Sequence, residues 1–403
     1  MQNSSHGSYV FSSARLERIT DMLTSHVEQS ALAGAVARIC HNDDVVYDKA
    51  VGWADIESSR QMNDETIFMI MSMSKPITAV AMMVLYEEGH FDLNTPVRDF
   101  IPAFGKLKVC AGENDDSSLD LQELEQDVTI RHLFTHTSGL SYGGDENDPV
   151  DREYQRVAKR YGEGKLPKTM ATMTEDICSL PLAFQPGTQW RYGFSTDVLG
   201  ALVEIISGLS FDVFLEEKVF MPLGMVDTAF FVPNEKVNRI ATTYTRSEPD
   251  ETLQPLKGRR PPNHRPDYLS GGGGLVSTIN DYANFCQMFL NRGKYDGYQL
   301  LSPTTVSLFS MNHTPDEAMQ FLSKNIPLFD GFGCGLSCWV LLDTSKTGSY
   351  GSEGEFGWSG AYNTYFWVDP KESFYAILMS QQSPNYWPKF YQRFKRLTYQ
   401  SMV

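Results

Sequence analysis

Strand-like runs occur near both ends of the chain, whereas its middle is helical or irregular. An opening helix, for which Ser13 is a candidate cap, precedes the runs 34–40 (GAVARIC) and 45–51 (VVYDKAV), which a short polar turn joins into a predicted antiparallel hairpin. The last third holds three further strand-like runs, at 332–342, 361–369 and 373–380. An amphipathic helix closes the chain, with one apolar face formed by Trp387, Phe390, Tyr391, Phe394 and Leu397. This order predicts one mostly antiparallel sheet built from both chain ends and flanked by helices.

The residues between these two groups of strands predict a separate helical part. We expect residues 96–230 to form an inserted helical domain, and residues 8–95 with 231–403 to form the sheet domain. A site shared by two such parts lies in the cleft between them.

The charge balance argues against several classes of function. The 403 residues include 50 acidic and 34 basic side chains, a formal net charge of −16 that repels nucleic acid and anionic membranes. No apolar run approaches the roughly 18 residues of a membrane span, and the polar start MQNSSHGSYVFSS does not resemble a signal peptide. The six cysteines contain no C-x-x-C pair, which favours free thiols and a cytoplasmic protein.

Ser72 and Lys75 form an S-x-x-K motif at the head of a predicted helix that ends at Gly89. The i, i+3 spacing places the hydroxyl and the amine on one face, at a helix end that also offers free N–H groups. A serine becomes a nucleophile only beside a base, and a partly desolvated lysine can serve as that base. Alone the motif is weak, since about one or two matches arise by chance in 400 residues. Its alternative interpretation is a helix cap with a surface lysine.

A second phrase, Gln185-Pro186-Gly187-Thr188-Gln189-Trp190-Arg191-Tyr192 followed by GFSTDVLG, makes the chain resemble the serine β-lactamase-like hydrolases. The resemblance is strongest to their family VIII carboxylesterase branch. It extends nearly end to end, through TIFMIMSMSKPITAVAMMVLYEEG, TIRHLFTHTSGLSY, GGGGLVSTINDYANFCQMFLNRG and GEFGWSGAYNTYFWVDP. It implies the α+β fold of class C β-lactamases and penicillin-binding proteins, an antiparallel sheet with helices and an inserted helical domain.

The resemblance also implies roles for individual residues. Ser72 would be the nucleophile, acting with Lys75 and Tyr192, and the backbone amides of Ser72 and Ala361 would form the oxyanion hole. Tyr192 would shuttle the proton, and whether it or Lys75 is the base stays open. A purely structural role for Tyr192, as a core aromatic, is the alternative.

Two departures from the β-lactamase pattern point to the substrate. Phe194 stands where those enzymes have the asparagine of Y-x-N, and Trp358-Ser359-Gly360 precedes the strand where they have K-T-G. Losing that lysine removes a hydrogen bond to a substrate carboxylate, typically worth about 1.5–3 kcal/mol. We therefore expect neutral acyl esters rather than β-lactams. The literal Lys346-Thr347-Gly348 is predicted to lie in a hairpin loop, because the glycine-rich stretch after it cannot form a regular strand.

Other motifs have simpler interpretations. Gly139-Leu140-Ser141-Tyr142-Gly143 fits a nucleophile elbow but lacks the strand before it and the helix after it, so Ser141 is predicted to be a turn residue. His132 and His136 have zinc-helix spacing, but a leucine occupies the position of the general base. Cys334 and Cys338 are predicted to be core thiols on one face of a strand, and the glycines 271–274 to allow close packing near the site.

The sequence thus predicts a serine carboxylesterase for short-chain or aryl esters that needs no metal or organic cofactor and has a small-molecule ester as its partner. The residues expected to contact the substrate are Phe194, Trp358, Gly360, Tyr142 and Tyr362. Three alternatives remain: a β-lactamase or D-amino-acid peptidase, an acyltransferase on a specific natural product, and a binding protein on the same fold.

Overall fold

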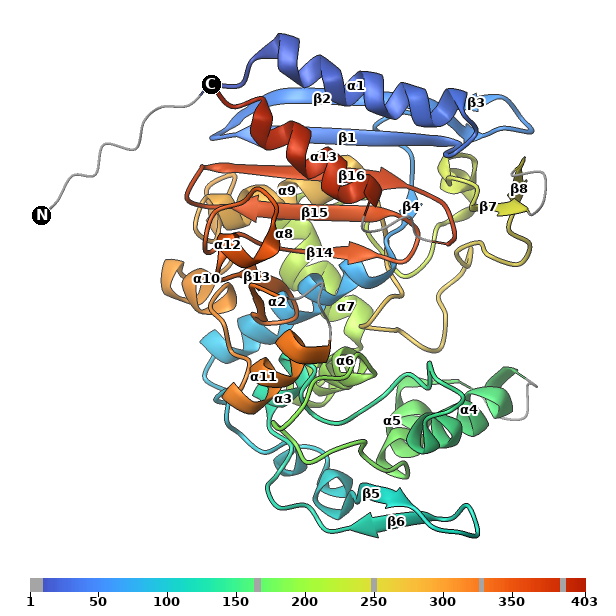
Figure 1. Ribbon diagram of the computed structural model, residues 1–403, viewed down its shortest axis with the longest axis vertical. Helices are drawn as coiled ribbons and strands as arrows, with labels where there is room; N and C mark the ends of the chain where they lie inside the picture. Colours follow the sequence, from blue (N-terminus) through green and yellow to red (C-terminus); the bar gives the residue numbers. More distant parts are fainter. Residues whose placement is uncertain (1–9, 163–167, 248–251, 326–329, 385–388) are drawn as a thin grey trace, which may run out of the picture.

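An eight-stranded antiparallel sheet dominates the computed structural model, which describes residues 10–162, 168–247, 252–325, 330–384 and 389–403. The strand order is β12-β13-β14-β15-β16-β1-β2-β3 (Figure 1). β1 pairs antiparallel with β16, so strands from the two chain ends meet in the middle of the sheet. The prediction of one sheet built from both ends is therefore confirmed. The strands are β1 (Gly34–His41), β2 (Asp44–Asp55), β3 (Arg60–Gln61), β12 (Phe332–Cys334), β13 (Trp339–Leu341), β14 (Phe356–Gly360), β15 (Thr364–Asp369) and β16 (Phe374–Ser380).

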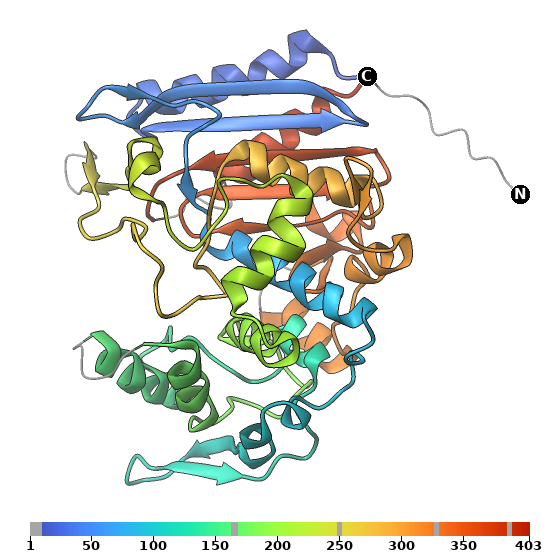
Figure 2. The same cartoon turned by 180° about the vertical axis from the view of Figure 1, so that it is seen from behind.

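Helices cover both faces of this sheet. The first helix, α1 (Ser13–Glu28), and the last, α13 (Lys389–Gln400), lie side by side on one face, whereas α9 (Ile279–Leu290) lies on the other (Figures 1 and 2). Under α1 and α13, apolar side chains of both helices pack on the sheet around the fully buried Trp367. Burial of each such side chain stabilises the fold by roughly 1.5–3 kcal/mol.

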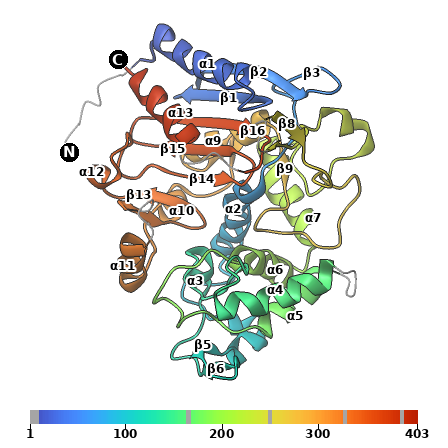
Figure 3. The same ribbon diagram turned by 45° about the vertical axis from the view of Figure 1, so that its right-hand side comes forward.

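The helix α2 (Ser74–Glu87) joins the sheet to the rest of the molecule. Its side chains are buried over most of its surface, and it packs against α6 (Ser195–Ser207). Figure 3 shows α2 running from the sheet down to the helices α3 (Ile130–Phe134), α4 (Pro149–Gly162) and α5 (Met170–Cys178). An all-round apolar helix requires neighbours on every side, and this explains its central place.

The remaining elements are short, and most lie in the connections. They are β4 (Phe68–Met69), η1 (Met71–Met73), η2 (Val97–Asp99), η3 (Pro102–Lys106), β5 (Val109–Glu113), β6 (Leu119–Gln122), α7 (Phe211–Leu215), η4 (Glu216–Phe220), α8 (Met221–Leu223), η5 (Asn234–Arg239), β7 (Tyr244–Ser247), β8 (Thr252–Pro255), β9 (Val276–Ser277), β10 (Lys294–Tyr295), β11 (Tyr298–Gln299), α10 (Pro303–Phe309), α11 (Asp316–Asn325) and α12 (Thr344–Thr347).

Several predicted boundaries are wrong. The run 332–342 is two strands joined by a turn at Ser337, whose φ is +58°, so Cys334 and Cys338 do not share a strand although both thiols are buried. The strand predicted at 361–369 begins only at Thr364, because the left-handed Asn363 (φ +62°) turns the chain after β14. The opening helix has Ser12, not Ser13, at its N-cap position. Trp387 lies outside the described residues.

The inserted segment is more mixed than predicted. Its strands β5 and β6 form a hairpin: β5 ends where the acidic stretch 113–127 begins, and β6 lies within that stretch. No strands were expected in this region. The domain limits 96 and 230 remain a prediction.

No single helix in the described part of the chain is both long and apolar enough to cross a membrane. The bent pair Ser195–Ser207 and Phe211–Leu223 passes that test jointly, by length and composition alone.

The close strand pairing at Gly357 yields a prediction. A Cβ added there would lie 2.2 Å from the Phe366 carbonyl oxygen, so Gly357→Ala must displace β14 from β15. We expect a loss of about 1–3 kcal/mol in the free energy of unfolding, measured by urea titration. Gly112→Ala, in a hairpin strand where a Cβ meets nothing within 4 Å, is the matched control. Equal unfolding midpoints for the two variants would contradict the proposed packing.

Candidate active site

Ser72 lies in the short 3₁₀ turn η1, immediately before α2. The preceding residue, Met71, has a φ of +48°, a left-handed conformation that is costly for a side chain of this size. The turn is held from three sides. Ser74 Oγ donates to the Met71 carbonyl (2.7 Å) and accepts from the Leu275 amide (3.2 Å). The Tyr282 hydroxyl donates to the carbonyl of Met73, the residue after Ser72 (2.9 Å). These bonds keep the serine hydroxyl in a fixed place.

Lys75 brings a buried amine to this serine. Its side chain is 1% exposed, and its Nζ lies 3.4 Å from Ser72 Oγ and donates to the Gly272 carbonyl at 2.6 Å. The ammonium also faces two aromatic rings, with its Nζ 4.4 Å from the Tyr192 centroid and 5.4 Å from the Tyr142 centroid. None of the ion pairs found among the described residues includes Lys75. A carbonyl and π-faces, rather than a carboxylate, therefore surround this amine.

Tyr192 completes the group that the sequence predicted, and other rings hold its own ring in place. It stacks on Trp190 (centroids 6.0 Å apart, planes 12° apart) and contacts His136 (4.8 Å) and Trp358 (6.0 Å). The structure thus brings Ser72, Lys75 and Tyr192 together from two distant parts of the sequence.

Asp197, on α6, fixes the loop that holds Lys75. Its Oδ1 accepts from the Tyr268 hydroxyl and Ser270 Oγ, both at 2.6 Å, and from the Gly272 amide at 3.3 Å, while its Oδ2 accepts from the Tyr142 hydroxyl at 3.3 Å. A Cβ on Gly272 would lie 2.5 Å from Asp197 Oδ2, so only glycine allows this approach. The prediction that the glycine run packs closely near the site is confirmed. Burial and the Asp197 carboxylate raise the pKa of Tyr142 well above its usual value, so that its hydroxyl remains a donor.

His136 is buried behind Tyr192, and no hydrogen-bond partner for either ring nitrogen is found in the described part of the chain. Its backbone is left-handed (φ +57°), and its ring also lies near Trp190 and Trp358. Burial, with the Lys75 ammonium nearby, lowers the pKa of His136 well below its usual value. The ring is therefore neutral beside Lys75.

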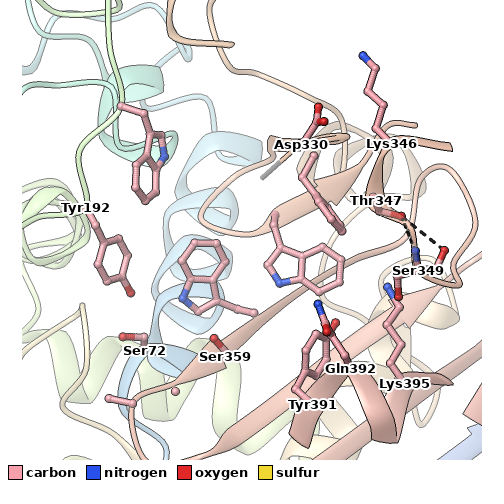
Figure 4. A pocket seen from close by; sticks show the side chains of 16 residues that line it. Ser72, Tyr192, Asp330, Lys346, Thr347, Ser349, Ser359, Tyr391, Gln392 and Lys395 are labelled. Carbon is pink, nitrogen blue, oxygen red and sulfur yellow. Dashed lines mark hydrogen bonds between the residues drawn. The ribbon is translucent and has the colours of Figure 1, made fainter. Parts of the chain in front are cut away.

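The pocket at Ser72 has a volume of about 440 Å³, which is within the range of small-molecule sites. Figure 4 shows Ser72 and Tyr192 on one side of it and Tyr391, Gln392 and Lys395 on the other. Its lining residues are Ser72, Trp190, Tyr192, Asp330, Phe332, Trp339, Lys346, Thr347, Ser349, Trp358, Ser359, Gly360, Ala361, Tyr391, Gln392 and Lys395.

Only part of the predicted substrate set lines this pocket. Trp358 and Gly360 line it, as does Ala361, the predicted oxyanion residue. Tyr142, Phe194 and Tyr362 are not among its lining residues. Phe194 lies behind the site, with its ring 4.7 Å from that of Tyr142 and stacked on Tyr154, and it is the N-cap residue of α6.

The literal K-T-G lies in the connection between β13 and β14, as predicted, although Lys346 and Thr347 belong to the short helix α12. The Lys346 side chain is 57% exposed, and its Nζ lies 3.8 Å from Asp343. Figure 4 shows this side chain pointing away from Ser72. Trp358, in β14, lies beside the serine instead.

The remaining motifs also have structural explanations. Ser141 lies in a loop with no strand before it, and its buried hydroxyl donates to Asp151. His132 Nδ1 accepts from the Thr129 amide (3.2 Å) as part of a capping box at the start of α3. Among the described residues, no three His, Cys, Asp or Glu side chains are placed to hold a metal ion.

Most of the pocket wall was not predicted from the sequence. Trp190 stood inside the quoted phrase that ends at Tyr192, and Tyr391 was assigned only to the apolar face of the last helix. Phe332, Trp339 and Lys395 carried no local signal, because they meet Ser72 only through the pairing of the sheet and the docking of α13.

The buried imidazole predicts a pH-dependent contribution to stability. Because the folded-state pKa of His136 is depressed, its neutral ring stabilises the protein above the ordinary histidine pKa, and this stabilisation is lost as the pH falls below it. His136→Phe keeps an aromatic ring but cannot be protonated. Between pH 7.5 and 5.0 we expect the free energy of unfolding of the wild type to fall by about 2 kcal/mol more than that of the variant.

Urea unfolding of both proteins at both pH values measures this difference. The other buried histidines with depressed pKa values, His132 and His313, are present in both proteins and cancel. If wild type and variant differ in their free energy of unfolding by the same amount at both pH values, His136 does not resist protonation.

Comparison with known proteins identifies the family of the chain. The beta-lactamase family model matches residues 19–397. Protein Rv1367c of Mycobacterium tuberculosis is 34% identical over 88% of this chain and 87% of its own length, and esterase EstB of Burkholderia gladioli is 28% identical over 91% and 90%. The solved structure of EstCE1, described as a hydrolase with promiscuous acyltransferase activity, has a TM-score of 0.76 at 22% identity and covers 96% of this chain and 99% of its own. The fold and the family match over almost the whole chain show that it belongs to the beta-lactamase family, whose relatives include serine hydrolases.

Proposed function

We propose that the chain is a carboxylesterase that hydrolyses neutral esters through an acyl-enzyme on Ser72. One observation carries the proposal: the buried Lys75 amine lies 3.4 Å from Ser72 Oγ and 4.4 Å from the centre of the Tyr192 ring, and Ser72 and Tyr192 both line a pocket rich in aromatic side chains. A nucleophile beside a base, with a third group that orients it, is the arrangement that acyl transfer requires.

The proposed reaction has two halves. Ser72 Oγ attacks the ester carbonyl while its proton passes to Lys75 or Tyr192, and the alcohol leaves with that proton. Water then attacks the acyl-enzyme, gives up a proton to the same group, and releases the acid and free Ser72. The backbone amides of Ser72 and Ala361, two pocket-lining residues, would stabilise the oxyanion in both halves.

The pocket supports a neutral, apolar ester. Trp358 takes the place of a cation beside the serine, and Lys346 is exposed at a distance from it. The likeness to esterase EstB favours the carboxylesterase branch over β-lactam hydrolysis. Six free cysteines favour a reducing compartment, and we propose a cytoplasmic location.

Acyl transfer to an alcohol is the second candidate, since it needs the same residues and differs only in whether an alcohol outcompetes water. The description of EstCE1 includes both activities. Adding an alcohol to the ester assay and measuring the new ester against the free acid separates the two.

Ser72→Ala provides the direct test. We expect a loss of about a thousandfold or more in p-nitrophenyl butyrate hydrolysis, because the variant cannot form the acyl-enzyme. Ser141→Ala, checked by circular dichroism for folding, is the control that should retain activity. Hydrolysis that survives in Ser72→Ala would place the nucleophile elsewhere, and nitrocefin hydrolysis as efficient as ester hydrolysis would favour a β-lactamase.

Asp197 predicts a second effect, on the position of Lys75. Asp197→Leu removes the acceptor of three hydrogen bonds to the 268–272 loop, and the carbonyl that binds Lys75 then loses its support. We expect kcat for p-nitrophenyl butyrate to fall by roughly 10- to 100-fold with a smaller change in KM. Asp197→Asn, which keeps an acceptor oxygen, should retain more activity. A folded Asp197→Leu enzyme with the wild-type kcat would contradict this role.

A further inference from the structure

A second buried lysine, Lys395, lies at the far side of the Ser72 pocket. It comes from α13, is 2% exposed, and donates to Glu355, which is fully buried. An ammonium has three N–H donors, and this pair uses one of them. Its Nζ also lies 5.4 Å from the Trp339 ring and 5.9 Å from the Phe332 ring, and both rings line the pocket.

The carboxyl groups around Lys395 carry an unusual number of hydrogen bonds. The Tyr399 hydroxyl lies 2.5 Å from Glu355 Oε2 and 2.6 Å from Asp369 Oδ2. One hydroxyl proton serves only one of these contacts, so the other requires a proton on a carboxyl group. Burial raises the pKa of Glu355 to about 7, against the opposing effect of the Lys395 ammonium, so a proton shared between Glu355 and Asp369 is compatible with this site. Two carboxyl groups that share one proton carry one negative charge between them, which balances the charge of the Lys395 ammonium.

A glycine lets the chain pack closely against the lysine–glutamate pair. A Cβ on Gly351 would lie 2.5 Å from Leu341 Cδ2, 2.8 Å from Glu355 Oε2 and 3.3 Å from Lys395 Nζ. With the polar Ser349 and Gln392 also lining this side, the pocket ends in hydrogen-bonding groups, whereas its walls are aromatic (Figure 4). Ligand sites combine apolar walls with a few placed polar groups that fix orientation.

We propose that Lys395 anchors the substrate at the end of the pocket remote from Ser72, and that the natural ester carries a flat aryl or polycyclic group with a carbonyl oxygen at its far end. The group would lie between the rings of Trp358, Trp339 and Phe332, and its carbonyl oxygen would accept from the Lys395 ammonium. A carboxylate is a poorer occupant, because the carboxyl pair of Glu355 and Asp369 already supplies one negative charge beside the ammonium. This inference rests on the proposed esterase activity and deepens it.

The test uses paired esters of one shape. 6-Acetyl-2-naphthyl acetate presents a ketone oxygen, and 6-isopropenyl-2-naphthyl acetate replaces it with a methylene group. For the wild type we expect kcat/KM to be roughly 10- to 100-fold higher for the ketone, since hydrogen bonds to charged groups have about this effect. Lys395→Met should bring the ratio close to one. A second pair, with the same ketone and methylene groups on biphenyl in place of naphthalene, places the ketone oxygen farther from the ester.

Two further variants make the result interpretable. Lys395→Met leaves Glu355 buried without its partner, so the double variant Lys395→Met/Glu355→Gln replaces both members of the pair and tests the same ratio. Lys389→Met, which changes an exposed lysine of the same helix, should keep the wild-type preference. Because each result is a ratio of two kcat/KM values for one preparation, the amount of active enzyme cancels.

The outcomes separate the two proposals. A wild-type ratio near one for both ring systems, or a ratio that persists in a folded Lys395 variant, would overturn the anchoring role. Faster hydrolysis of 6-carboxy-2-naphthyl acetate than of the ketone would overturn the carbonyl assignment. Hydrolysis of p-nitrophenyl butyrate that is absent, or that survives Ser72→Ala, would instead refute the esterase function on which the inference rests.

Discussion

The hydrogen bond from Lys75 to the Gly272 carbonyl connects the three parts of the site. Lys75 belongs to the buried helix α2, and its carbonyl partner Gly272 lies in a loop after the helical segment. Asp197 on α6 holds that loop by accepting hydrogen bonds from the Gly272 amide and from the hydroxyls of Tyr268 and Ser270. Because no carboxylate is paired with Lys75 in the described residues, its amine lies at a carbonyl and two tyrosine rings while it remains within reach of Ser72. A shift of the sheet relative to the helices would change the distance between Lys75 Nζ and Ser72 Oγ. The proposed acyl transfer therefore depends on the packing of α2 against α6.

Two buried lysines, Lys75 beside Ser72 and Lys395 at the far side of the pocket, have different surroundings. Lys75 lies among rings and a carbonyl, where proton transfer with a serine or a tyrosine is possible. Lys395 is paired with a buried glutamate whose own pKa is raised by burial, an environment suited to holding a position rather than to exchanging protons with a substrate.

The main features of the site were predictable because they are local in sequence. Ser72 and Lys75 are three residues apart, and Tyr192 stands in a phrase distinctive enough to reveal the family resemblance. The alternation of strands and helices also indicated one sheet made from both chain ends, which the β1–β16 pairing confirms. Errors arose where single residues with left-handed backbones break a run, as Ser337 and Asn363 do, because propensity and periodicity do not register such turns.

By itself the sequence determined the fold family, the candidate nucleophile with its lysine and tyrosine, and the absence of a lysine at the strand beside the serine. These properties depend on short spacings and on hydrophobic periodicity, which are local. Tertiary structure alone decided that Phe194, Tyr142 and Tyr362 do not line the pocket beside Ser72 and that Trp190, Trp339, Phe332 and Lys395 do. The reason is physical: the far wall of the pocket forms only when β12, β13 and α13 pack together, and no pattern along the chain specifies which side chains then face the same cavity.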